Sequence, residues 1–246
     1  MAPRLDNQFM TRVQGIATSA DVDAGLRSYM LRVYNYMVLG LALTGAIAFF
    51  ISTSPSIWQL FFTPTGLSGL GWIAMLSPLA PVLFFMFGYE RMSPGMAQAM
   101  FWLYAGLNGI GFALIFMVFL PADIFRAFFI TAGMFAGMSL IGYTTKRDLT
   151  GLGGFLMMGV IGLIIASVVN IFLGSTGLMF IISIASVLIF AGLTAYDTQK
   201  IKENYYQVGH DGTLAQKSAI FGALMLYIDF IVMFRNILYL MSIARE

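Results

Sequence analysis

Two aspartates in strongly apolar surroundings carry most of the chemistry that this sequence offers. Asp229 lies in the stretch 223–234, where Tyr227 is the only other polar residue. Asp197 lies in the stretch 194–200, at the end of another long apolar run. An ionisable side chain inside a membrane costs at least about 2.5–3.5 kcal/mol, so residues of this kind usually serve a function.

Two such carboxyl groups have a definite chemistry if they meet in a poorly hydrated site. Both cannot ionise cheaply there, so the pair is expected to share a proton and to respond to pH. Without that proton it is an anionic all-oxygen site of the kind that attracts Ca²⁺. We therefore predict Asp197 and Asp229 as a proton-sensing pair and as transient Ca²⁺ ligands. Arg91, at an inner helix end, is the expected cation that neutralises one carboxylate and locks a closed state.

A purely structural role for the aspartates is the alternative. Asp229 could instead contact Arg235, or hydroxyl groups and the side-chain amides of residues such as Asn108 and Asn170. Within one helix Arg235 lies on a different face from Asp229, since six residues separate them. Residue counting also leaves Asp197 and Asp229 on the order of 10 Å apart in depth, which tilt or an inner vestibule must close.

The elements that position these residues are predicted to be transmembrane helices. Of the 246 residues, 59% are apolar and 10% are charged, whereas a soluble domain carries about 25% charged residues. Seven stretches approach or exceed the roughly 20 apolar residues that a spanning helix needs: 33–51, 70–89, 96–119, 124–143, 151–173, 178–199 and 218–243. We predict an all-α integral membrane protein of seven transmembrane helices, with a cytoplasmic tail at 1–32 and a membrane domain at 33–246.

Local signals refine these helices. Pro78 and Pro81 predict a kink in the second span, where neighbouring groups must satisfy the freed carbonyls. A polar loop is predicted at 200–217. Gly133 and Gly137, four residues apart, and the glycines of the fifth span predict close helix packing, the latter being Gly151, Gly154, Gly159 and Gly162.

Basic residues predict the orientation, because they concentrate on the cytoplasmic side. With the N-terminus inside, the inner segments hold 10 of the 13 Lys and Arg residues. The N-terminus is therefore expected to be cytoplasmic. A seventh span that crosses fully places the C-terminus outside, whereas a re-entrant one leaves it inside.

The composition excludes several classes of site. The chain has no cysteine, so disulfides, zinc–cysteine sites, iron–sulfur clusters and thiol catalysis are excluded. His210 is the only histidine and cannot form a histidine metal cluster. The sequence contains no ATP-binding motif, and no basic stripe with interleaved aromatics predicts nucleic-acid binding. We expect no tightly bound cofactor and no enzymatic activity.

Two motifs resemble signatures of a known family. Residues 196–202, Tyr-Asp-Thr-Gln-Lys-Ile-Lys, and 226–231, Leu-Tyr-Ile-Asp-Phe-Ile, are similar to the sixth-helix and last-helix motifs of the Bax inhibitor-1 family. The resemblance implies a seven-helix bundle with the last helix central. It also implies a pH-sensitive calcium leak in which Asp197 and Asp229 share a proton and Arg91 engages them. Val232 and Arg235 depart from the family, which often has asparagine and an apolar residue there.

The leading hypothesis is therefore a proton-gated pathway for Ca²⁺ in a bacterial inner membrane. A first alternative is a non-conducting regulator that binds other membrane proteins in quality control or in the control of stress and cell death. A second alternative is an intramembrane aspartyl protease, but the Gly-x-Gly-Asp motif of that class is replaced here by Leu226-Tyr227-Ile228-Asp229. The expected partners are the lipid bilayer, Ca²⁺ and protons.

Overall fold

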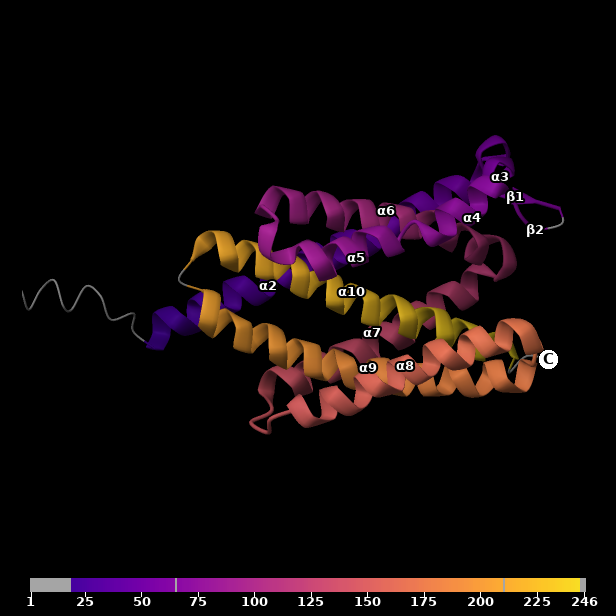
Figure 1. Cartoon of the computed structure of the whole chain (residues 1–246). Helices are drawn as coiled ribbons and strands as arrows, with labels where there is room; N and C mark the ends of the chain where they lie inside the picture. The colour runs from indigo at the N-terminus through magenta and orange to yellow at the C-terminus, as the bar shows by residue number, and fades with distance from the viewer. Residues whose placement is uncertain (1–18, 65, 210, 244–246) are drawn as a thin grey trace, which may run out of the picture.

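The computed structural model describes residues 19–64, 66–209 and 211–243 as a bundle of long helices (Figure 1). Within these residues, six helices are long and apolar enough to cross a membrane. They are α2 (Ser19–Thr53), α6 (Pro94–Val118), α7 (Pro121–Thr144), α8 (Thr150–Leu173), α9 (Thr176–Val208) and α10 (Gly212–Ile243). The predicted all-α membrane class agrees with this architecture.

The second predicted span consists of two short helices. α4 (Gly69–Leu76) and α5 (Leu79–Gly88) are separated at Ser77 and Pro78, and a 3-10 turn, η1 (Tyr89–Arg91), follows. Proline lacks the amide hydrogen and obstructs the preceding helical turn, so the predicted kink forms here. The segment 69–88 is about 30 Å long at 1.5 Å per residue. It is long enough to cross a bilayer, but its crossing, and with it the count of seven spans, stays a prediction.

The two ends of the bundle differ in their connections (Figure 1). The N-terminal end carries the α5–α6, α7–α8 and α9–α10 connections. The opposite end, called the distal end below, carries α3 (Pro55–Phe61) and a two-stranded antiparallel ribbon of β1 (Phe62–Thr63) and β2 (Gly66–Leu67). α10 is continuous and runs from the N-terminal end of the bundle to the distal end.

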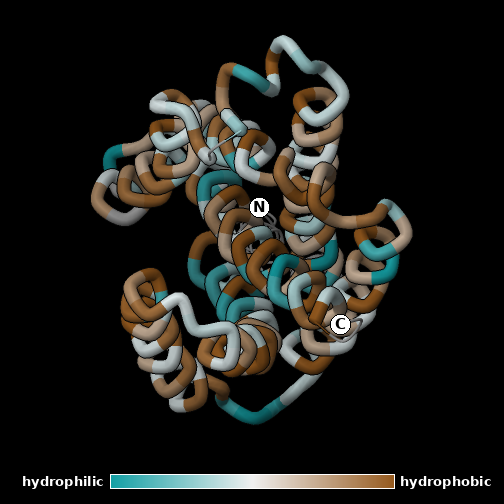
Figure 2. Tube along the Cα trace, turned by 90° about the vertical axis from the view of Figure 1, so that its right-hand side faces the viewer, coloured by the Kyte–Doolittle hydropathy of each residue, from teal (hydrophilic) through white to brown (hydrophobic). Residues whose placement is uncertain are grey.

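α10 is the central helix of the bundle. Of its most apolar 18 residues 72% are buried, against 6% for α8. α10 packs against α9, α2, α7 and α6, whereas α8 packs chiefly against α9. In the end-on view, apolar positions cover much of the outside, while several hydrophilic positions lie toward the middle (Figure 2). An apolar outer surface around polar interior groups is the arrangement that a bilayer favours.

Two helices extend beyond the predicted spans. α2 begins at Ser19 and passes without a break through residue 32, and the boundary between the tail and the membrane domain there stays a prediction. The predicted loop at 200–217 was wrong, since α9 continues to Val208 and α10 begins at Gly212. Charged residues were taken as helix ends, but lysine and glutamate are good helix formers, so a helix can continue beyond the hydrocarbon. Residues 1–18 and His210 lie outside the described residues.

The prediction that glycines of the fourth and fifth spans mark close helix packing was mostly wrong. A Cβ atom added at Gly133 or Gly137 would meet no other atom within 4 Å, so neither glycine permits a close helix contact. In the fifth span only Gly159, which faces Ile189, is tightly packed among the four predicted glycines. The close contacts lie elsewhere: a Cβ at Gly142 would overlap the backbone carbonyl of Ala195.

Candidate functional site: a buried aspartate pair

The two predicted aspartates meet in the interior, where α9 packs on α10. The side chain of Asp197 is 6% exposed and that of Asp229 is 2% exposed. Their carboxyl groups lie within hydrogen-bonding reach of each other, and Asp229 also lies within reach of Thr194, whose hydroxyl donates to the carbonyl of Phe190. A hydrogen bond between two carboxyl groups requires an O–H donor, so it can form only while one of the two is protonated.

The helix geometry explains how the pair assembles. Thr194 and Asp197 are three residues apart on α9 and therefore share one face of that helix. Part of the depth mismatch expected from the sequence came from ending this helix near Gln199. Since α9 continues to Val208, Asp197 lies well inside the helix and not at its end.

One oxygen of the pair remains without a partner. Asp229 Oδ2 is fully buried and accepts no hydrogen bond from any described residue. Neither proposed amide forms that bond: the side-chain nitrogen of Asn108 donates to the carbonyl of Tyr104, and the side-chain oxygen of Asn170 accepts from the backbone N–H of Ser175. A buried acceptor without a partner lowers the stability of the folded state by about 1–3 kcal/mol. The site therefore keeps a polar atom whose hydrogen-bonding capacity is not used.

A buried hydroxyl cluster lies near Asp229 along α10. Thr44 Oγ1 lies 2.6 Å from the hydroxyl of Tyr227 and 2.8 Å from the carbonyl oxygen of Ala105. Thr44 can therefore donate to Ala105 while it accepts from Tyr227. This cluster links α10 to α2 and α6 two residues before Asp229.

A second hydroxyl chain fixes the turn of α9 that carries Asp197. The hydroxyl of Tyr34 lies 2.6 Å from Ser139 Oγ, which lies 3.0 Å from Thr198 Oγ1. Thr198 in turn donates to the carbonyl of Thr194 at 2.7 Å. The chain joins α2, α7 and α9 and so limits how α9 can rotate.

The sequence reasoning missed these hydroxyl groups, although two signals were present. Thr194 precedes Asp197 by three residues, the spacing of one helix face. Tyr227 lies in the motif that contains Asp229. Thr44, Tyr34 and Ser139 come from distant helices and left no signal of this kind.

Arg91 is placed at the N-terminal end of the bundle, in η1. Its side chain is exposed, and among the described residues it makes no hydrogen bond or ion pair. The neighbouring Tyr89 is held by Lys217 of α10, whose Nζ donates to the Tyr89 carbonyl at 2.9 Å and lies 4.5 Å from its ring centroid. The structure therefore does not bring Arg91 into contact with the aspartates, and its engagement with them stays a prediction.

The pair alone is not a complete calcium cage. Among the described residues, no group of three or more histidine, cysteine or acidic side chains is placed to hold a metal ion. Ca²⁺ takes 6–8 oxygen ligands, so two carboxyl groups supply only part of a site.

Comparison with known proteins shows a consistent set of relatives. Residues 26–246 match the model of a family described as inhibitor of apoptosis-promoting Bax1. The chain is 48% identical over 219 residues to an uncharacterized protein of Rickettsia prowazekii, with 89% of each chain covered. It is 42% identical over 217 residues to the inner membrane protein YbhL of Escherichia coli, with 87% of this chain and 91% of that protein covered.

Proposed function

The chain belongs to the Bax inhibitor-1 family of integral membrane proteins, and from this premise we propose that it forms a pH-sensitive leak pathway for Ca²⁺. The contact between the buried carboxyl groups of Asp197 and Asp229 carries the proposal. The inner membrane of a bacterium is the proposed location, since YbhL carries that description.

The shared proton supplies the gate. With one proton between them, the carboxyl groups attract each other and hold α9 against α10. Loss of that proton leaves two adjacent negative charges in a poorly hydrated site, where like charges repel strongly. Since α10 is central, separation of α9 from α10 would open the middle of the bundle. Flux is therefore expected to increase as the pH rises.

The separated carboxylates would then coordinate the passing Ca²⁺ ion. Oxygen atoms from both side chains can replace part of the hydration shell of Ca²⁺. A site with two carboxylates and few other ligands binds weakly enough to release the ion. Passive conduction needs this balance between entry and exit.

The non-conducting regulator remains the second candidate. The N-terminal end, where the polar ends of α9 and α10 meet, is the surface that a partner would contact. Photo-crosslinked partners that persist in an Asp197→Asn, Asp229→Asn double variant would favour this function. The protease candidate has less support, because the Gly-x-Gly-Asp motif of that class is replaced here by Leu226-Tyr227-Ile228-Asp229.

Ca²⁺ flux into dye-loaded proteoliposomes, measured from pH 6 to pH 8, tests the proposal. Wild type should show a flux that rises with pH. Asp229→Asn and Asp197→Asn should each remove that dependence, because an amide cannot lose the proton. Asp211→Asn, on an exposed acidic residue at the N-terminal end, is the matched control and should behave as wild type.

Folded protein that gives no flux above empty liposomes at any pH would overturn the conduction proposal. A flux whose pH dependence survives both asparagine substitutions would keep conduction but reject the aspartate pair as its gate. Size-exclusion profiles of all variants establish folding independently of flux.

A further inference from the structure

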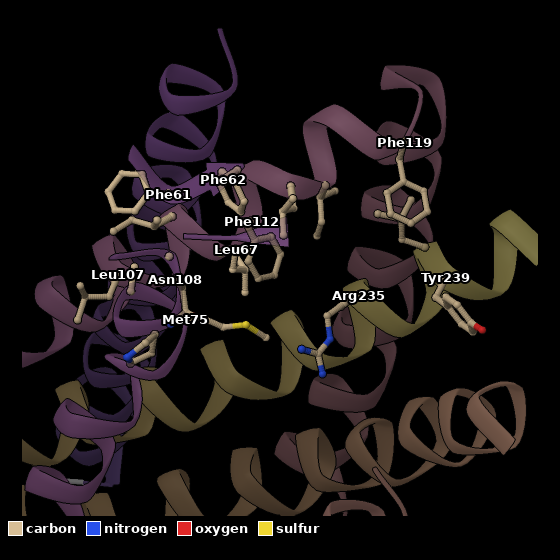
Figure 3. A pocket seen from close by; sticks show the side chains of 18 of the residues that line it. Phe61, Phe62, Leu67, Met75, Leu107, Asn108, Phe112, Phe119, Arg235 and Tyr239 are labelled. Carbon is tan, nitrogen blue, oxygen red and sulfur yellow. The ribbon is translucent and has the colours of Figure 1, made fainter. Parts of the chain in front are cut away.

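A cavity of about 400 Å³ lies toward the distal end, away from the aspartate pair. Its walls come from α3, the β1–β2 ribbon, α4, α6 and α10, and they are largely apolar, with Phe62, Met75 and Phe112 among the lining side chains (Figure 3). Small-molecule sites are typically apolar cavities of about 300–1,000 Å³ with a few polar groups. This cavity has the size and the lining of such a site.

Arg235 supplies the charged group of this cavity. Figure 3 shows it projecting from α10 with its guanidinium group turned toward Met75. Arg235 is exposed although Phe234 and Asn236 on either side are buried, because its side chain faces the open space. Among the described residues, the guanidinium group forms no hydrogen bond and no ion pair.

The cavity provides no counter-charge for Arg235. None of its lining residues is acidic. The nearest acidic residue along α10, Asp229, is hydrogen-bonded to Asp197. Arginine within a membrane normally pairs with an acid or with backbone carbonyls, because an unpaired charge there is costly. An anionic ligand in the cavity would supply the missing counter-charge.

Neutral donors stand beside the arginine. Asn108 and Asn236 line the same cavity, and each uses its side-chain nitrogen to donate to a carbonyl one helical turn earlier. The amide nitrogen carries two hydrogens, so each asparagine keeps a second N–H for a ligand. The guanidinium group of arginine can bind a carboxylate or phosphate through two parallel N–H···O bonds. Amide N–H groups beside it can donate further hydrogen bonds to the same anion.

We propose that this cavity binds an amphipathic anion, with its carboxylate or phosphate on Arg235 and its apolar tail against the aromatic walls. A fatty-acid anion and an anionic phospholipid share this chemistry. The site is separate from the aspartate pair and does not depend on whether the protein conducts ions.

The thermal midpoint of the full-length protein in a non-ionic detergent, titrated with decanoate, tests the proposal. Decanoate should raise the midpoint saturably, whereas decanol, its uncharged analogue, should not. Arg235→Gln should weaken decanoate binding by at least about tenfold, the loss expected for a hydrogen bond to a charged group. Arg126→Gln is the matched control, since Arg126 lies on α7 near the distal end with its side chain 63% exposed.

Native mass spectrometry distinguishes the two sources. Protein reconstituted in nanodiscs that contain phosphatidylglycerol should retain one such lipid if phospholipid is the occupant, and Arg235→Gln should lose it. Retention of decanoate but not of phosphatidylglycerol would assign the site to free fatty-acid anions.

Equal binding of decanoate and decanol, or equal binding by wild type and a folded Arg235→Gln, would overturn the proposal. Absence of both decanoate binding and lipid retention would also overturn it and would mean that Arg235 is simply hydrated. None of these readouts uses ion flux, so they are independent of the proposed leak.

Discussion

At the scale of single residues, the interior of this bundle depends on polar groups that find partners. Asp197 with Asp229, Thr44 with Tyr227, and Ser139 with Thr198 each join different helices. In lipid, helices gain little from hydrophobic association, so packing and interhelical hydrogen bonds hold them together. The same bonds that position the aspartates therefore also stabilise the bundle.

The Thr44–Tyr227 bond gives a direct test of this view. Tyr227→Phe should lower the free energy of unfolding by about 0.6–1.7 kcal/mol, the range measured for interhelical hydrogen bonds. Thr44→Val should cost more, because it leaves the buried Tyr227 hydroxyl without its acceptor. Unfolding in mixed micelles measures both effects. Tyr206→Phe, at a side chain that is 51% exposed, is the control, and an equal loss there would refute the explanation.

Arg235 should oppose cation flux if the proposed pathway follows α10. At an effective dielectric constant of about 20, the repulsion between a divalent cation and a guanidinium group about 10 Å away is about 3 kcal/mol. Arg235→Leu should therefore raise Ca²⁺ flux by at least about tenfold in liposomes of zwitterionic lipid. Arg126→Leu should leave the flux unchanged. An unchanged flux in Arg235→Leu would mean that ions pass elsewhere, without bearing on the anion site.

At the scale of elements, the start of α8 contains a pH-dependent contact outside the membrane-spanning segments. Hydrogen bonds from the side chain and the backbone of Thr150 lower the pKa of Asp148, and the backbone bond is 2.8 Å long. Because the folded pKa lies below the unfolded value, this contact stabilises the folded state above the unfolded pKa. The stabilisation is lost as the pH falls through the folded pKa.

Amide hydrogen exchange in the first turn of α8 measures this effect. Between pH 6 and pH 3, protection relative to intrinsic exchange should fall in wild type. Asp148→Asn should remove that change, since asparagine can accept the same bond but does not titrate. Identical pH dependence in wild type and Asp148→Asn would show that Asp148 does not stabilise this turn.

At the scale of the whole molecule, the two short helices α4 and α5 decide the number of crossings. Gln59 before them and Ser93 after them lie at opposite ends of the bundle (Figure 1). The chain lacks cysteine, so single cysteines report accessibility without background. In right-side-out vesicles, an impermeant maleimide should label Gln59→Cys but not Ser93→Cys.

That experiment also tests the orientation predicted from the basic residues. Lys146→Cys, in the α7–α8 connection, should be protected together with Ser93→Cys. Labelling of Gln59→Cys and Ser93→Cys from the same side would show that α4 and α5 do not cross. Labelling of Ser93→Cys and Lys146→Cys alone would reverse the predicted orientation.

The class of this protein and most of its long helices could be predicted from the order of its residues. Runs of apolar residues and scarce charge leave a chain stable only when lipid covers it, and this pattern is local enough to read directly. The break at Pro78 was also predictable, because proline acts on its own helical turn. The two aspartates were evident because charge is rare in such stretches.

Which groups meet is a property of the helix packing. The contact of Asp197 with Asp229 depends on how α9 packs on α10, and residue counting also placed the end of α9 too early, because charged residues do not end a helix. The exposed place of Arg91, the glycines that face no neighbour and the cavity around Arg235 all depend on how helices far apart in sequence are rotated against each other. Hydropathy carries little information about rotation, because lipid and a neighbouring helix are both apolar surroundings.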